Sequence, residues 1–221
     1  MTHLDVIGLG MNVLDILIRI EEMPTWQAPG HPSHILVDGG GLAATAIVAA
    51  QQLGLQTGFV GTYGNDQMGW IKHQLLQKYG VDLSHDVQLD RAENQVCIVY
   101  VRESDGERFF SNHPEFWQHA LSPQRLNQAY ITSADWLHID GVHFAAAQQA
   151  AQWMQAAGKR VMFDGGRPHE KQLKEDQCDL LPYVDVLISG AGFLEMVTGE
   201  SDLQAAGRKA LEMGPSIVVQ T

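Results

Sequence analysis

The residues best suited to chemistry stand in the first quarter of the chain. Asn12 and Asp15 follow an apolar run at 4–9 that predicts a buried strand, and open α/β sheets bind ligands at the carboxyl ends of their strands. A glycine triplet at 39–41 opens into an alanine-rich helix that reaches Gly54. A ligand can lie against glycine backbone, and a helix N-terminus offers unpaired N–H donors to an oxygen-rich ligand. The pattern predicts a polar-ligand site, and a tight turn before a buried helix is the competing interpretation.

Composition limits the classes of partner. The 221 residues carry a formal net charge of -12, which argues against nucleic acid or an anionic membrane as the main partner. Asp5 and Asp15 interrupt the apolar N-terminal run, so it predicts neither a signal peptide nor a membrane span, and we expect a cytoplasmic protein. Cys97 and Cys178 lie far apart and are expected to be inert, reduced thiols. The ten histidines lack the spacing of a protein-ligated metal centre.

Two kinds of segment must position these residues. Four β-prone segments do not alternate with helices and predict a small separate sheet, or lid; they lie at about 13–20, 33–38, 95–101 and 107–111. The last two flank a Ser-Asp-Gly turn signal at 104–106 and predict a hairpin. The rest of the chain alternates strand and helix, which predicts a mostly parallel sheet covered on both faces within one domain spanning 1–221.

The alternation gives specific bounds. Strands are expected at 57–62, 135–139, 160–164, 185–189 and 216–220. Helices are expected at 68–79, 145–157, 170–180, 190–197 and 203–213, the last of them capped by Ser201. Ser122-Pro123 predicts a further helix start, because proline suits the first helical position.

Six segments, in this order, carry a family resemblance: VIGLGMNVLD, GGGLAATAIVAAQQLG, FVGTYGNDQMG, ADWLHIDG, VMFDGGRP and VLISGAGFLEMVTGE. Together they resemble the ribokinase-like (PfkB) carbohydrate kinases over essentially the whole chain. The resemblance implies an α/β three-layer sandwich with a small β-sheet lid. It also implies phosphorylation of a sugar hydroxyl by ATP with Mg²⁺.

The resemblance assigns acceptor contacts to particular residues. Asp15 matches the aspartate that hydrogen-bonds sugar hydroxyls, and Asn12 lies beside it. Gly40 and Gly41 match the glycine pair that packs against the sugar. Thr45 is placed where most members carry asparagine, although a helical threonine can instead bond its own backbone.

Further roles follow from the second half of the chain. Asp140 falls where several members place an acidic or polar residue near the substrate. Glu195 matches the acidic end of an Asn-x-x-Glu motif that acts on Mg²⁺ through water, but Gly192 replaces its asparagine. The family's Gly-Ala-Gly-Asp motif, which supplies the catalytic base and an anion hole, has no match up to Thr221. We therefore expect an incomplete kinase that is inactive as written.

Several alternatives stay open from the sequence. The first hypothesis is an ATP-dependent kinase of a small-molecule sugar or polyol that forms a homodimer through its lid. A catalytically silent sugar-binding or regulatory protein of the same fold, or a nucleoside kinase, would share most of these features. Arg167 could contact an anionic substrate group or be solvated, and Asn112 and His113 could reach the sugar or serve the loop.

Overall fold

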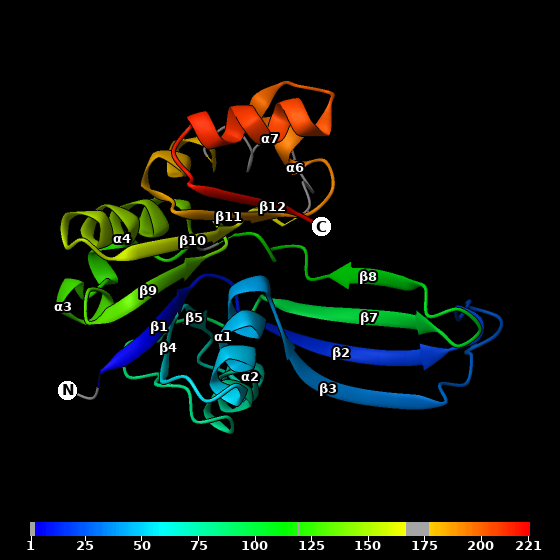
Figure 1. The fold of residues 1–221 in the computed structure, drawn as a ribbon. Coiled ribbons are helices and arrows are strands. Elements are labelled where there is room, and N and C mark those ends of the chain that lie inside the picture. Colours follow the sequence, from blue (N-terminus) through cyan, green and yellow to red (C-terminus); the bar gives the residue numbers. More distant parts are fainter. Residues whose placement is uncertain (1–2, 119, 167–176) are drawn as a thin grey trace.

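A six-stranded parallel sheet forms the centre of the molecule (Figure 1). The computed structural model describes residues 3–118, 120–166 and 177–221. The strand order is β12-β11-β10-β9-β1-β4, so β1 lies one strand from the β4 edge, and β9 to β12 follow on its other side. The strands are β1 (Leu4–Leu9), β4 (Thr57–Val60), β9 (Ala134–Ile139), β10 (Arg160–Asp164), β11 (Val186–Ser189) and β12 (Ile217–Gln220). The mostly parallel α/β sheet predicted from the sequence is confirmed.

Helices lie on both sides of this sheet. One apolar cluster joins α1 (Leu42–Gln52) and α2 (Gln67–Gln77) to one face, and the other face packs against α3 (Gln128–Ile131), α4 (Phe144–Ala156), α6 (Phe193–Thr198) and α7 (Leu203–Glu212). Helix α4 buries four of its alanines and Met154 at helical spacing, the pattern of an amphipathic helix packed on a core; the four are Ala146, Ala147, Ala150 and Ala151. The cap of α7 is Asp202, whose carboxylate accepts the Ala205 N–H at 2.8 Å. The prediction of a Ser201 cap is wrong by one residue.

The lid is a separate four-stranded sheet that projects to one side of the core (Figure 1). Its order is β3-β2-β7-β8, with β2 antiparallel to β3 and parallel to β7, and a β7–β8 hairpin. The strands are β2 (Val13–Ile20), β3 (His34–Gly40), β7 (Val96–Arg102) and β8 (Arg108–Asn112). These bounds lie within a few residues of the predicted ones, so the local alternation of side chains was sufficient to locate them.

Three predicted elements differ from the structure. The segment at 57–62 breaks after Val60, and β5 (Thr62–Tyr63) pairs instead with β6 (Val87–Gln88). The proline at 123 starts only a three-residue 3₁₀ helix, Pro123–Arg125, because the chain becomes extended again at Leu126. Most of the helix predicted at 170–180 lies outside the described residues, and Cys178–Tyr183 is a 3₁₀ helix. Within the described part of the chain, no helix has the length and apolar character needed to cross a bilayer.

Candidate functional site

Asp140 joins three segments where the carboxyl ends of β1 and β9 meet the start of α1. Its buried carboxylate accepts the backbone N–H groups of Met11 at 2.7 Å, Val142 at 3.0 Å and Ala43 at 3.4 Å. Burial outweighs these bonds and raises the pKa of Asp140 to about 6. Gly10 is required here because any Cβ would overlap the carboxylate. The carboxylate thus fixes the loop that leads from the core into the lid.

Two N–H groups in the first turn of α1 are bound within the protein itself. The N-cap of this helix, Gly41, has a positive φ of 93°, which favours glycine, and a Cβ there would collide with the Met11 carbonyl. The Ala44 N–H reaches that carbonyl at 3.4 Å, and the Ala43 N–H is bound to Asp140. The expectation that this helix offers its first N–H groups to a ligand is therefore wrong for Ala43 and Ala44, because an internal carboxylate and carbonyl occupy them.

Asp15 lies on β2 at the core end of the lid. Its carboxylate occupies the space above Gly40, where a Cβ would overlap it. In the strand register Asp15 pairs with Asp38 on one side and Cys97 on the other. Partial burial, followed by repulsion from Asp38, raises the pKa of Asp15 to about 6. The structure thus places Asp15 against Gly40, next to Gly41 in the chain; their role in sugar binding stays a prediction.

Asn12 and Thr45 occupy contrasting environments. Asn12 is buried, its Nδ2 lies 3.5 Å from the Lys72 carbonyl, and its Oδ1 has no hydrogen-bond partner among the described residues. Thr45 is exposed in the first turn of α1, whereas Ala43 and Ala44 are buried. Asn12 therefore has an acceptor atom available for a ligand, while Thr45 faces away from the helix's packed side.

A buried ion pair beneath the lid was missed from the sequence. Lys72 Nζ lies 2.9 Å from Glu93 Oε2 and 3.0 Å from Gln95 Oε1, with both charged side chains almost fully buried. Burial lowers the pKa of Lys72, and Glu93 opposes that shift. The sequence did contain a sign that Lys72 is buried, because Lys72 falls between Gly69 and Leu76 on the buried face of α2. The pair connects α2 to the segment that enters β7.

A second group of polar atoms lies near the carboxyl ends of β11 and β12. Glu195 stands in the first turn of α6, after Gly192 in a left-handed conformation. Buried oxygens of Glu195, Ser189 and Gln220 have no hydrogen-bond partner among the described residues. Such oxygens could accept hydrogen bonds from the water shell of a cation, which fits the expected indirect Mg²⁺ role of Glu195. Ser189 and Gln220 were not singled out from the sequence.

The remaining sequence candidates receive less support. Asn112 is exposed at the end of β8, and the His113 Nδ1 accepts the Glu115 N–H at 3.1 Å within the following loop. This bond favours the loop role for His113. Arg167 lies outside the described residues.

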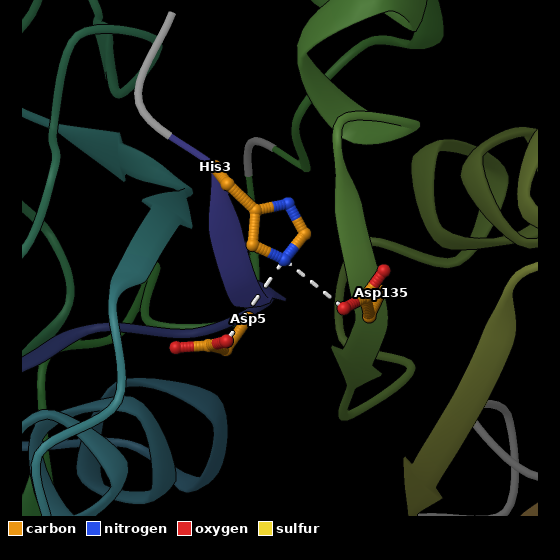
Figure 2. A group of neighbouring side chains, drawn as sticks. All are labelled: His3, Asp5 and Asp135. Atoms are coloured by element: carbon orange, nitrogen blue, oxygen red, sulfur yellow. Dashed lines mark hydrogen bonds and ion pairs between the residues drawn. The ribbon is translucent and has the colours of Figure 1, made fainter.

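One cluster with metal-ligand chemistry lies away from these groups, at the amino ends of β1 and β9. Figure 2 shows His3 reaching toward two carboxylates, with its Nε2 3.1 Å from Asp135 Oδ2 and 4.0 Å from Asp5 Oδ1. Lys159 Nζ also binds Asp135 at 2.8 Å. Because a lysine already neutralises one carboxylate, we assign the cluster as a surface ion-pair network between neighbouring strands.

Comparison with known proteins gives consistent matches. The family model described as "pfkB family carbohydrate kinase" matches residues 1–221. An ATP-dependent ribose-1-phosphate kinase of Halopiger xanaduensis is 26% identical over 184 residues, covering 83% of this chain and 60% of its own length. A fructokinase of Salmonella typhimurium is 28% identical, covering 76% of this chain and 55% of its own length. The chain therefore spans somewhat more than half the length of these relatives.

Solved structures show the same fold. A putative ribokinase II from E. coli has a TM-score of 0.81 at 21% identity, covering 98% of this chain and 73% of that one. Ribokinase from Thermotoga maritima has a TM-score of 0.80 at 18% identity, covering 98% and 71%. At these identities the likeness establishes the fold, an α/β sandwich with a lid.

Proposed function

This chain belongs to the pfkB family of carbohydrate kinases, and on that premise we propose that it binds a small sugar or sugar derivative whose hydroxyl is phosphorylated by ATP. The observation that carries the proposal is the Asp15 carboxylate, held over Gly40 at the junction of lid and core. A carboxylate can accept hydrogen bonds from two hydroxyls, which orients a polyol better than a neutral acceptor would. The fructokinase and ribose-1-phosphate kinase relatives support sugar phosphorylation at the level of the family.

Each residue of the acceptor site has a distinct proposed role. Asp15 accepts sugar hydroxyls and the Oδ1 of Asn12 accepts another. Gly40 leaves room for the Asp15 carboxylate and Gly41 for the Met11 carbonyl, so the two glycines let the backbone of the site pack closely around the sugar-binding groups. Asp140 contributes chiefly by position, since its carboxylate already accepts three N–H groups. The exposed Thr45 is the weakest of the predicted contacts.

ATP and Mg²⁺ are the proposed cosubstrate and metal. A solved neighbour of the same fold, a putative ribokinase II from E. coli, is described in complex with ATP and Mg²⁺. In this chain the buried Glu195 oxygen would hold a water of the Mg²⁺ shell, and the metal would neutralise charge on the transferring phosphoryl group. Inactivity of the 221 residues alone stays a prediction.

Homodimerisation through the lid is the second part of the proposal. The lid face opposite Asp15 exposes Ile35 by 60%, Phe109 by 60% and Val37 by 44%. Ile18 and Tyr100 lie in register between Ile35 and Phe109, and Ile16 and Ile98 continue the row that starts at Val37. An apolar, open sheet face of this kind is covered well by a second copy. Ile35→Lys should shift a dimer to monomer in sedimentation, and a wild-type monomer at all concentrations would contradict the proposal.

The acceptor site is tested by calorimetry and by Mg·ATP-dependent ADP release across a panel of sugars and nucleosides. We expect sugar binding that Asp15→Ala abolishes, with Glu212→Gln on the exposed end of α7 as a control of equal charge change. If the chain binds nucleosides but not sugars, the acceptor is a nucleoside and the chain belongs to a nucleoside kinase. Sugar binding without ADP release, in this chain and in any longer natural form, would support the silent binding protein. A folded chain that binds no member would refute the proposal.

A further inference from the structure

The buried carboxylate of Glu93 ties three separate segments together where the lid joins the core. Its Oε2 accepts the N–H of Gly64 at 2.9 Å and lies 2.9 Å from Lys72 Nζ. Its Oε1 accepts the N–H groups of Asn94 at 3.0 Å and Gln95 at 2.8 Å, in the segment that enters β7. Several donors on one carboxylate hold it in a single position, so Glu93 fixes the start of β7 to α2 and to the loop before that helix.

The same ion pair reaches the strand that carries Asp15. The Gln95 side chain accepts a hydrogen bond from Lys72 Nζ at 3.0 Å, and the Gln95 backbone carbonyl accepts the N–H of Leu14 at 2.9 Å. Leu14 immediately precedes Asp15 on β2. On the other side, Asn12 Nδ2 lies 3.5 Å from the Lys72 carbonyl. Lys72 therefore contacts the chain before Asp15 directly and the neighbouring strand through Gln95.

Burying two charges is costly, and filling the same space does not require it. Both side chains of the Lys72–Glu93 pair are almost fully buried. Well-packed apolar residues in place of a buried ion pair often give equal or greater stability. Apolar side chains would lack the directionality of hydrogen bonds, which fixes how the joined segments are oriented. The pair is thus suited to setting the geometry of the segments that it joins.

From this arrangement we propose that Lys72 and Glu93 are positioning residues, which hold the starts of β2 and β7 on α2 so that Asp15 is in place before the sugar binds. The inference rests on the proposed sugar-binding function and goes beyond it, because neither residue is among the proposed sugar contacts. A preorganised carboxylate binds more tightly, since less ordering has to accompany binding. Loosening the pair should therefore weaken sugar binding while every proposed sugar contact remains in the chain.

The first test is calorimetry of the folded 221-residue chain with ribose, fructose and glucose as probes. Lys72→Met keeps the length of the side chain and removes its charge, and Glu93→Gln is a milder change that keeps an acceptor oxygen. We expect both variants to weaken binding about tenfold. The control is Met154→Ala, which leaves a cavity in the apolar cluster on the other face of the sheet and so destabilises the fold away from the lid. It should leave the affinity unchanged.

The second test is amide hydrogen exchange followed by NMR, which reports local opening. In Lys72→Met and Glu93→Gln, the Leu14 N–H should exchange about tenfold faster relative to the amides of β1 than it does in the wild type. In Met154→Ala this ratio should stay at the wild-type value. A contribution of the ion pair to global stability alone would not change the ratio.

The outcomes separate the inference from the function on which it rests. If Lys72→Met and Glu93→Gln lose no more affinity than Met154→Ala, or if the Leu14 exchange ratio is unchanged in them, the inference is wrong and sugar binding stands. If Lys72→Met does not fold, Glu93→Gln decides. If no probe binds the folded wild-type chain, the proposed function fails; the exchange ratio then decides separately whether the pair anchors the lid.

Discussion

Replacing Asp15 with asparagine should stabilise the fold while abolishing sugar binding. The carboxylate is partly buried and faces Asp38, and its pKa is raised from 3.8 to about 6. A shift of about 2 units corresponds to about 3 kcal/mol at 1.36 kcal/mol per unit. Because Asp15 is still partly solvated, screening reduces this figure, and we expect Asp15→Asn to gain about 1–2 kcal/mol of unfolding free energy at pH 7.5.

The sign of the pH dependence follows from the direction of the shift. Above pH 6 Asp15 is ionised in both the folded and the unfolded chain, and the folded state bears the full cost of the buried charge. As the pH falls from about 7 toward 4, the folded state takes up a proton first, so the wild type gains stability that Asp15→Asn cannot gain. Asp140, whose pKa is also about 6, is present in both proteins and cancels in the comparison.

Urea denaturation of both proteins at pH 7.5, 6 and 4.5 measures this difference. We expect the advantage of Asp15→Asn to shrink steadily as the pH falls. Asp38→Asn is the matched control, because it removes the repulsion, returns the pKa of Asp15 toward its ordinary value and leaves the partial burial in place; it should give a smaller gain. An Asp15→Asn variant that is less stable than wild type at pH 7.5, or whose advantage does not change with pH, would refute the reasoning.

Three further changes test other parts of the structure. Gly40→Ala should weaken sugar binding about tenfold or more in calorimetry, because the added Cβ would displace the Asp15 carboxylate. Gly39→Ala should bind the sugar normally, because the structure has room for a Cβ at that position. Lys72→Met should lower the urea-derived unfolding free energy by about 3–5 kcal/mol by leaving a buried carboxylate without its counter-ion; a loss below about 1 kcal/mol would mean that the pair is hydrated. Asp202→Ala should cost about 1 kcal/mol as a lost helix cap and lower the melting temperature, while Ser201→Ala should not; equal losses would contradict the assigned cap.

Much of the fold was predictable because its signals are local. The strands Leu4–Leu9 and Arg160–Asp164 agree with prediction to the residue, and the four lid strands to within a few residues. Alternating or continuous apolar runs bounded by glycine and proline are sufficient for this purpose. The break after Val60 could not be predicted from such runs, because both halves of 57–62 are β-prone. The halves differ only in the strand that each pairs with, β1 for the first half and β6 for the second.

The residues of the candidate site likewise fall into two groups: those that a local sequence pattern identifies and those that it does not. Asp15, Gly40 and Gly41 could be picked out from the sequence because a motif and the absence of side chains mark them. Only the helical spacing of Lys72 relative to the buried residues of α2 indicated that it is buried. Its partner Glu93 lies in a separate segment whose sequence shows no helical or strand periodicity that would reveal the pair.

The sequence by itself determined the kind of fold, the family and the carboxylate at the lid, because each depends on residue types at short spacing. Only the tertiary structure decided which polar groups are available to a ligand. The Asp140 carboxylate and the Ala43 N–H at the start of α1 lie 97 residues apart in the sequence, and their hydrogen bond occupies a donor that sequence reasoning had left free for a ligand. Strand register likewise set Asp38 beside Asp15. Pairings of this kind depend on which distant backbone atoms meet, and no local pattern encodes them.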